Sequence, residues 1–449
     1  MDKREFLKAS GVFMAGTLVG RFASGEEESA HRTNWAGNYE YRAEHLLQPK
    51  TVEEVQAAVR SCSTLKALGA RHSFNGIADN RENQISLTAL DTMTLDAKAR
   101  TVTVGAGVRY GQLAPYIDGK GYALRNLASL PHISVAGACA TATHGSGNKN
   151  RNLSTAVSEM EIVTADGDVR VLSRQKDGER FHGAVVALGG LGVVTKTTLD
   201  MLPTFQVSQV VYENLSMDVL EHHLDEIFGS AYSVSLFTDW QNHRIGQVWV
   251  KRRVESGSSS KFAPELFGAK LATQKLHPIP GHSAEPCTEQ MGIPGPWYER
   301  LPHFKMNFTP SSGAELQTEY FVPRDKGYAA ILAVEQLRDQ ITPHLFVTEL
   351  RTIDADDLWM SMAYERPSMA IHFTWKPEWL EVKKILPQIE EKLAPFNAKP
   401  HWAKLFTVPP ARLKQLYGKM PEYQALCKEY DPQGKFRNDF LNTNIFASS

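Results

Sequence analysis

The sequence predicts an α+β protein with two domains and a short C-terminal segment. At 449 residues the chain is too long for one ordinary core. Residues 38–204 alternate short strands, helices and glycine-rich turns, which is typical of a mixed domain. Residues 205–400 carry longer alternating strands with helices between them, which indicates an antiparallel sheet covered by helices on one side. Residues 401–449 are too few to fold alone, so we expect them to pack back on the first domain.

Each element of the first domain has a local signal. Thr51 and Glu54 form a capping box, and the spacing of Val52, Val55 and Val59 predicts a helix behind it. The other predicted elements are a buried strand in TLKALG (64–69), a strand, glycine turn and helix in RTVTVGAGVRYGQLAPYI (100–117), a hairpin turning at Asp166-Gly167, and a strand fed by a glycine-rich turn in ALGGLGVVTKTTLDMLP (187–203).

The second domain is predicted from four strands and three helices. Their order along the chain is FQVSQVVYEN (205–214), a helix near 217–228, ELQTEYFV (315–322), a helix near 325–340, HLFVTELRTI (344–353), MAIHFTW (369–375) and a helix near 379–394.

Composition excludes several classes of protein. The formal net charge is −1 and no long run of Lys and Arg occurs, which argues against nucleic-acid binding. Beyond the N-terminus no apolar run approaches the ~20 residues of a membrane-spanning helix. The four cysteines are far apart and form no C-x-x-C pair, so neither a zinc site, nor any other metal site, nor a dense disulfide framework is expected.

The N-terminus has the anatomy of a signal peptide over residues 1–25. A basic start precedes an apolar segment over 11–20 and small residues over 23–25. KREFLK resembles a twin-arginine export signal with Lys3 in place of the first arginine. This predicts export to the periplasm or beyond through the twin-arginine machinery. The alternative is a frayed basic N-terminus on a cytoplasmic protein.

Three glycine-punctuated stretches share the first domain, namely GARHSFNG (69–76), ASLPHISVAGACATATHGSG (128–147) and ALGGLGVVT (187–195). Such stretches let backbone N–H groups approach a phosphate closely. Neither the dinucleotide G-x-G-x-x-G pattern nor the P-loop is present, so the phosphate carrier is bound in another way.

This combination resembles the FAD flavoproteins of the vanillyl-alcohol-oxidase (PCMH) type, and among them the alditol oxidases. The matching stretches, in chain order, are NWAGN (34–38), RHSFN (71–75), ASLPHISVAG (128–137), ATHGSG (142–147), TELRT (348–352), HFTW (372–375), HWAKLF (401–406) and GKFRN (434–438). The resemblance implies an FAD-binding domain over 38–204 and an antiparallel-sheet substrate (cap) domain over 205–400.

The resemblance also implies which residues bind FAD. His72 takes the place of the histidine that bonds covalently to the flavin 8-methyl carbon. Ala70 and Arg71 stand where many relatives carry a serine-glycine pair. The implied cofactor residues are Ala67, Leu68, Gly69, Ala70, Arg71, His72 and Ser73 around the pyrophosphate, Ser129, Ser134, Gly137, Thr141, Ala142, Thr143 and His144 on the other side, Val194 at the adenine end and His401 at the isoalloxazine.

Polar pairs spaced two residues apart mark the second domain. Residues i and i+2 of a strand share a face, so Glu349 pairs with Arg351 among apolar neighbours. His372 and Thr374 form a second pair, and Gln317 and Glu319 a third. If the strands are antiparallel neighbours, the pairs join into one polar patch. A solvated sheet face with a salt bridge is the alternative.

The resemblance gives these residues roles. Ser129, Gln317, Glu349, Arg351 and Thr374 are the implied substrate residues, and Lys404, Glu349, Arg351 and His372 the implied catalytic residues. Lys404 is the candidate nearest the reacting hydroxyl, either as a base or as a stabiliser of the anionic reduced flavin. His372 is the rival base.

The expected activity is oxidation of the terminal hydroxyl of an alditol such as xylitol or sorbitol. The products would be the aldose and, through hydride transfer to flavin N5 and then O₂, hydrogen peroxide. The nearest alternative is an aldonolactone (gulonolactone-type) oxidoreductase with a non-oxygen acceptor, and Ala128, at the place that bears on oxygen access, is compatible with either. The other alternative is a non-catalytic flavin- or sugar-binding protein. A monomer is expected.

Overall fold

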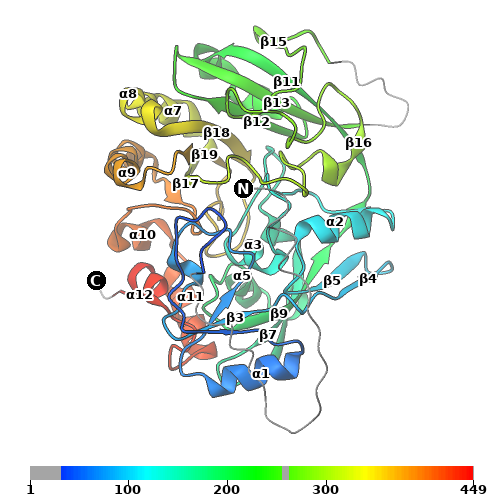
Figure 1. The fold of residues 1–449 in the computed structure, drawn as a ribbon, viewed down its shortest axis with the longest axis vertical. Coiled ribbons are helices and arrows are strands. Elements are labelled where there is room, and N and C mark those ends of the chain that lie inside the picture. Colours follow the sequence, from blue (N-terminus) through cyan, green and yellow to red (C-terminus); the bar gives the residue numbers. More distant parts are fainter. Residues whose placement is uncertain (1–31, 255–261, 448–449) are drawn as a thin grey trace, which may run out of the picture.

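The computed structural model describes residues 32–254 and 262–447, in two lobes stacked along the long axis of the molecule (Figure 1). The signal segment predicted over residues 1–25 lies outside the described residues. The lower lobe mixes short helices with two small sheets, and the upper lobe is built on one large antiparallel sheet. The predicted α+β class is therefore confirmed.

Helix α1 (Val52–Ser61) forms as its capping signal predicts. The Thr51 hydroxyl accepts from the backbone N–H of Glu54 at 3.2 Å, whereas the Glu54 carboxylate accepts from the N–H of Lys50 rather than of Thr51. Val55 and Val59 are buried, and they pack in a core shared with the parallel sheet.

The lower lobe holds two sheets. One is parallel, in the order β1 (His45–Leu47), β3 (Asn83–Ser86), β2 (Lys66–Leu68). The other is antiparallel, in the order β4 (Met93–Asp96), β5 (Thr101–Gly105), β9 (Val193–Asp200), β7 (Val157–Val163), β8 (Val169–Ser173). The predicted hairpin between β7 and β8 turns at Gly167, whose φ of 82° favours glycine. The minor pair is β6 (Tyr122–Ala123) with β10 (Leu202–Pro203), and the helices are α2 (Tyr110–Asp118), α3 (Val135–Ala140), α4 (Arg174–Asp177) and α5 (Glu179–Val185).

The upper lobe is an antiparallel sheet with the four predicted strands in it. Its order is β14 (Glu265–Leu266), β15 (Ala269–Leu271), β11 (Gln206–Ser216), β13 (Arg244–Val254), β12 (Ser233–Thr238), β18 (Leu345–Ile353), β19 (Ser368–Trp375), β17 (Leu316–Pro323), β20 (Lys399–Pro400), with β16 (Gly295–Pro296) on β11.

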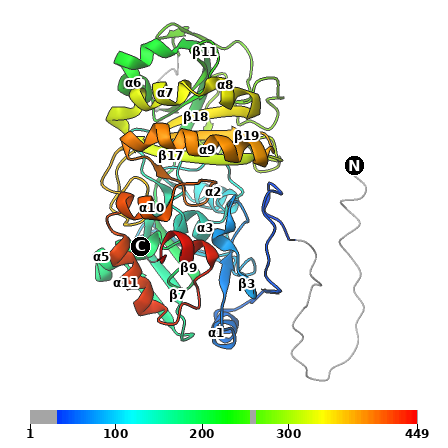
Figure 2. The ribbon, with the colours of Figure 1, turned by 90° about the vertical axis from the view of Figure 1, so that its left-hand side faces the viewer.

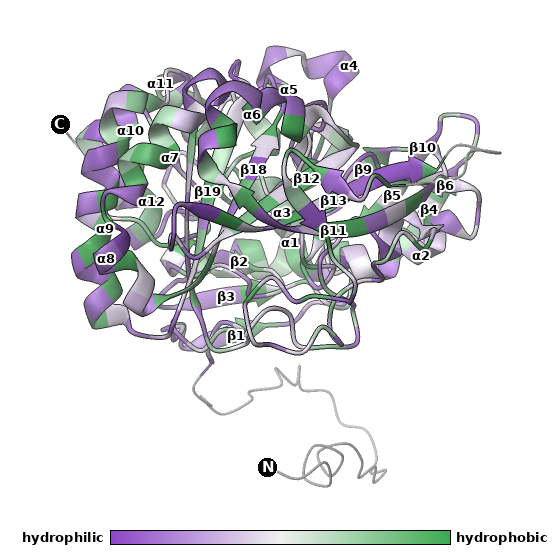
Figure 3. Ribbon diagram, turned by 90° about the horizontal axis from the view of Figure 1, so that it is seen from above, coloured by the Kyte–Doolittle hydropathy of each residue, from purple (hydrophilic) through white to green (hydrophobic). Residues whose placement is uncertain are grey.

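Helices α6 (Leu220–Gly229), α7 (Gly327–Glu335) and α9 (Trp379–Leu393) cover one side of this sheet, as predicted (Figure 2). α9 buries five apolar residues at helical spacing against the sheet, and its outward face is mostly hydrophilic (Figure 3). The helix predicted over 325–340 is instead two helices, α7 and α8 (Arg338–Ile341), because the chain turns at Leu337, which is buried in the same core.

The C-terminal segment lies against the lower lobe (Figure 2). Its helices are α10 (Pro410–Leu416), α11 (Met420–Tyr430) and α12 (Asp439–Asn444). Tyr423 of α11 is wholly buried and donates its hydroxyl to the carbonyl of Ala187 at 2.5 Å. Trp402 and Tyr417 lie in the same core as α5, so this segment shares the core of the lower lobe. Among the helices of the described ranges, none combines the length and apolar character needed to cross a bilayer.

Candidate active site

A large cavity lies where the two lobes and the C-terminal segment meet. Its walls include the turn after β2, the stretch around α3, the glycine-rich turn before β9 and the sheet face opposite the helices. The connection between β15 and β17 and the C-terminal segment also line it. Most of the residues expected at a flavin site line it: Ala67, Leu68, Gly69, Ala70, Arg71, His72, Ser73, Ser129, Ser134, Gly137, Thr141, Thr143, His144, Val194, Gln317, Glu349, Arg351, His372, Thr374, His401 and Lys404.

Ala142 is the exception, since it is buried beside the cavity without lining it. Its φ is 53°, which turns the chain inward, and the side chain packs in the core of the lower lobe. The side chain of Ala142 therefore does not line the cavity, and its expected contact with the cofactor stays a prediction.

Small residues keep the lower wall of the cavity close to the backbone. A Cβ added at Gly69 would lie 2.9 Å from the Ser134 hydroxyl, and one at Gly137 would lie 2.7 Å from the same oxygen. The N–H of Ala70 faces that hydroxyl at 3.4 Å. Glycine is thus required on both sides of Ser134, and the exposed N–H groups of such a turn suit a phosphate group.

Arg71 adopts a left-handed conformation in this turn, with a φ of 62°. Glycine would adopt this conformation without strain, whereas a left-handed non-glycine residue costs roughly 1–2 kcal/mol. The backbone is held in place, because the carbonyl of Arg71 accepts from the N–H of Trp35 at 3.1 Å.

Arg71→Gly should therefore raise the free energy of unfolding by about 0.5–1 kcal/mol, after allowing for the extra freedom of glycine in the unfolded chain. Arg100→Gly is the matched control, because Arg100 is also exposed and has a φ of 54° far along the chain from this turn. Chemical denaturation measures both. A loss of stability in both variants would contradict the backbone explanation, and a smaller gain in R71G than in R100G measures what the Arg71 guanidinium contributes to the bound cofactor.

His72 lies half-buried at the cavity wall. Burial, with smaller contributions from His132 and Lys404, lowers its pKa to about 3, so the imidazole is neutral at pH 7. The ring of Trp35 stacks on it with 5.2 Å between centroids. Its Nδ1 atom is buried and has no hydrogen-bond partner in the chain.

The residues present fit an FAD group. Three cavity-lining side chains, those of Trp35, Tyr41 and His72, each bury a polar atom that finds no partner in the protein. Buried polar atoms without partners are costly, so a polar ligand with acceptors and donors is expected to satisfy them. The glycine cradle about Ser134 supplies the close backbone approach that a pyrophosphate needs.

On the upper wall, strand register builds the predicted polar patch. Glu349 of β18 lies opposite His372 of β19, which lies opposite Glu319 of β17. One row along, Thr374 lies opposite Gln317. Alternate residues of the same strands face the helices instead, so every one of these side chains turns toward the cavity. The polar patch, defined as Gln317, Glu319, Glu349, Arg351, His372 and Thr374, is therefore confirmed as one surface.

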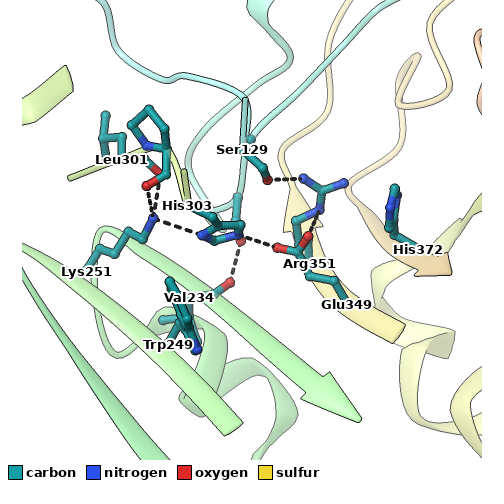
Figure 4. A network of polar contacts seen from close by, with 12 residues as sticks. Ser129, Val234, Trp249, Lys251, Leu301, His303, Glu349, Arg351 and His372 are labelled. Atoms are coloured by element: carbon teal, nitrogen blue, oxygen red, sulfur yellow. Dashed lines mark hydrogen bonds and ion pairs between the residues drawn. The ribbon is translucent and has the colours of Figure 1, made fainter. Parts of the chain in front are cut away.

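Arg351 is the centre of charge in the polar patch. Its guanidinium lies 3.6 Å from Glu349 and 3.3 Å from the hydroxyl of Ser129 (Figure 4). It also lies 2.5 Å from Glu319. Burial alone would raise the pKa of both carboxyl groups, but the charge of Arg351 and the histidines beside them outweigh burial, and both pKa values lie well below the usual range. Both carboxylates are therefore ionised and acceptor-only at neutral pH.

Glu319 was predicted to lie in the polar patch, but no role was predicted for it. Besides Arg351, it accepts from His144 Nε2 at 3.1 Å and lies 3.5 Å from His372 Nδ1. The nearest ligand atoms of His144, Glu319 and His401 lie within 4.8 Å of one another, a spacing that a metal ion could use. Glu319 Oε1 already accepts hydrogen bonds from Arg351 and His144. We therefore assign the cluster to binding and orientation within the cavity.

Lys404 enters the cavity from the C-terminal segment. Its ammonium donates to the side-chain oxygen of Gln317 and lies 4.8 Å from the centre of the Phe74 ring. Burial, partly offset by Glu319, lowers its pKa to about 8. Asn75 donates to the carbonyl of Lys404 at 2.7 Å, and this contact ties the lysine to the turn that carries His72.

Two cavity residues had no signal that sequence reasoning used. His303 lies between prolines and aromatic residues in a segment without periodicity, and Trp35 was noted only as part of NWAGN. A buried lysine in an apolar strand, Lys251 in VWVKRRV, was the only hint of the contacts behind His303.

Comparison with known proteins gives the same assignment. Residues 43–173 match the family model described as FAD binding domain, and residues 311–444 match the model described as D-arabinono-1,4-lactone oxidase. The chain is 46% identical to an alditol oxidase of a Streptomyces species over 91% of this chain and 97% of that protein. It is 27% identical to L-gulono-1,4-lactone dehydrogenase of Mycobacterium tuberculosis, over 91% and 97%, and 24% identical to L-gulonolactone oxidase of Bos taurus, over 91% and 96%. Because this likeness runs along nearly the whole chain and an FAD-binding domain model matches the first lobe, the protein belongs to the alditol oxidase family of FAD flavoproteins.

Proposed function

We propose that the protein oxidises the terminal hydroxyl of an alditol to the aldose, with FAD as the hydride acceptor and O₂ as the final oxidant, giving H₂O₂. The observation that carries the proposal is the polar patch, a buried array of donors and acceptors on the cavity wall that faces the cradle. The similarity to a protein described as an alditol oxidase supports the same substrate class.

The array suits a substrate with a hydroxyl on every carbon. Glu349 accepts from a hydroxyl, Arg351 donates, and Ser129 and Thr374 can do either. Each of these side chains is buried or lines the cavity, so a substrate lacking a matching hydroxyl would leave a polar group unpaired. The site should therefore favour polyols over simple alcohols.

Proton removal from the reacting hydroxyl falls to Lys404. When bound, FAD supplies the acceptor for the hydride of the carbinol carbon. The lowered pKa of Lys404 leaves a useful fraction of neutral amine near pH 8, and Gln317 holds the side chain in the cavity. His372 is a weaker candidate because its Nδ1 side faces the Glu319 carboxylate at 3.5 Å.

The visible spectrum of the purified protein tests the proposal. The protein is mixed anaerobically with xylitol or sorbitol and then opened to air. Bleaching of the yellow colour, followed by rapid recovery and peroxide, is the expected result. Bleaching with slow recovery would mean that the substrate class is right and the acceptor is not oxygen, and no bleaching by alditols would overturn the proposal.

A second candidate is oxidation of an aldonolactone. It is favoured by the match of residues 311–444, which include the whole polar patch, to a lactone oxidase family model, and by the gulonolactone relatives. The same spectrum decides between the two, because bleaching by L-gulono-1,4-lactone and not by alditols would establish this candidate.

We also propose that His72 holds the flavin covalently. Its ring is neutral, lines the cavity beside Trp35 and has an unpartnered Nδ1, which suits a nucleophile. Denatured and digested protein should yield flavin attached to the peptide that contains His72, and His72→Ala should release all its flavin on denaturation. Free flavin from the unchanged protein would rule the link out.

Export through the twin-arginine machinery and a monomeric state complete the proposal. KREFLK and the apolar stretch after it support export. Expressed in a bacterium, the full chain should reach the periplasm, and Arg4→Lys or loss of the translocase should retain it in the cytoplasm. Retention of the unchanged chain in a competent host would overturn this point, and light scattering of the purified protein gives the oligomeric state.

A further inference from the structure

Glu349 is held from behind by a pair of residues that the proposed chemistry does not use. His303 Nε2 lies 2.8 Å from Glu349 Oε1, and His303 Nδ1 lies 3.2 Å from Lys251 Nζ (Figure 4). Lys251 comes from β13 and is 1% exposed, whereas His303 comes from the segment between β16 and β17 and is 5% exposed. The three side chains thus form a buried line that ends at the cavity.

The chemistry of the partners fixes which atom donates in each contact. The Glu349 carboxylate is ionised and can only accept, so Nε2 of His303 must carry the hydrogen. Burial, then Lys251, lowers the pKa of His303 to about 4, so the ring is neutral at pH 7 and its Nδ1 is an acceptor. Lys251 also faces the carbonyls of Leu301 and Pro302, at 2.5 and 3.1 Å, so its Nζ is the donor toward three acceptors. Burial lowers the pKa of Lys251 to about 7, and only the protonated form has an N–H for each acceptor.

The imidazole cannot easily turn away from these partners. The rings of Trp249 and Phe237 meet it edge-on, with centroids at 5.1 and 5.6 Å. The backbone N–H of His303 donates to the carbonyl of Ser129 at 3.0 Å, which joins this segment to the substrate wall of the lower lobe. Ring orientation and tautomer are therefore both set by the fold.

We propose that Lys251 and His303 are positioning residues that hold the Glu349 carboxylate in the orientation that accepts a substrate hydroxyl. With Oε1 engaged by His303, Oε2 stays 3.6 Å from Arg351 and is left free to accept in the cavity. Without His303, the carboxylate can rotate onto Arg351, and both groups would be withdrawn from the substrate. The inference rests on the proposed alditol oxidation, since it concerns how that substrate is held.

The test compares His303→Leu, His303→Gln and Lys251→Met with the unchanged holoenzyme. Loss of a hydrogen bond to a charged group should raise the KM for sorbitol about 10- to 100-fold in H303L, with kcat changed by less than about 5-fold. Gln keeps an N–H near the position of Nε2, so H303Q should restore KM to within about 5-fold. K251M should give an intermediate KM, because Nδ1 of His303 loses the donor that holds the ring against Glu349.

A second readout needs no turnover. Excess sorbitol, added anaerobically, should raise the Tm of the unchanged protein and of H303Q, and should raise it less in H303L and K251M. Lys399→Met is the matched control, because Lys399 is a buried lysine of the same sheet that does not line the cavity and lies against the Tyr417 ring. It should lower stability and leave KM unchanged.

The outcomes separate the inference from the proposed function. If the unchanged protein neither oxidises nor binds alditols, the proposed function fails. If the unchanged protein is active and the KM of H303L lies within twofold of the unchanged protein's KM, the positioning role is overturned. It is also overturned if K399M raises KM as much as K251M does. If H303L fails to fold, K251M decides instead. The positioning role is overturned if K251M has an unchanged KM and an unchanged Tm shift with sorbitol.

Discussion

Replacing Lys404 by methionine should lower the rate of flavin reduction by alditols about 10²- to 10⁴-fold, the usual worth of a positioned general base. Methionine keeps the length of the side chain and removes the amine that reaches Gln317 across the cavity. Substrate binding should suffer much less, because the other members of the hydroxyl-binding array stay in place. Stopped-flow measurement of anaerobic bleaching, at saturating and at limiting sorbitol, separates the two effects.

The pH dependence of the same rate tests the protonation state. The pKa of Lys404 is lowered to about 8, chiefly by burial. Only the neutral amine can take a proton, so reduction should speed up as the pH rises through about 8, and K404M should lose this rise. Lys399→Met should keep it, since its buried amine lies outside the cavity. A rate that falls above pH 8 would assign Lys404 the other role, stabilising the anionic reduced flavin, and fast reduction in K404M would leave it neither role.

The polar patch could be predicted from the sequence because a strand repeats every two residues. Glu349 and Arg351, spaced by two in an apolar run, had to share a face, and antiparallel pairing then placed His372 and Glu319 in the same row. Gly69 and Gly137 were likewise visible as members of glycine-rich turns. These signals are local, so one sequence was enough to read them.

The contacts behind the patch could not be predicted in that way. Lys251 and His303 meet across 52 positions of the chain, and His303 lies in a segment with no period. Whether a histidine between prolines reaches a carboxylate depends on how the long connection folds over the sheet, which no local rule supplies. The same holds for Ala142, whose side chain packs in the core of the lower lobe although its neighbours Thr141 and Thr143 line the cavity.

Arg351→Met should be the most destabilising of the substitutions considered. The guanidinium is almost wholly buried and lies against two buried carboxylates, Glu319 and Glu349. Breaking a buried charge pair costs about 3–5 kcal/mol, because the remaining charge is left uncompensated. Urea unfolding at pH 7 should show a loss of this size together with loss of alditol oxidation.

The pH profile of that loss identifies its cause. In the unchanged protein the folded-state pKa values of Glu319 and Glu349 lie below their unfolded values, so the pairs stabilise the fold above the unfolded pKa and lose that effect as the pH falls. In R351M the buried carboxyl groups of Glu319 and Glu349 lose the positive charge of Arg351, so their folded-state pKa values rise. The difference between the two proteins should therefore be largest near neutral pH and shrink below about pH 4.5, where both carboxyl groups of the unfolded chain are protonated.

A double variant separates charge from packing. Adding Glu319→Gln to R351M removes one of the two stranded carboxylates, so it should recover part of the lost stability, whereas Glu319→Gln alone should destabilise. If R351M loses less than about 1 kcal/mol at pH 7, or if the double variant is no more stable than R351M, the two carboxylates are not held by Arg351. The upper wall of the cavity would then owe its order to the strand register and to His303 and His144, which approach the carboxylates from the other sides.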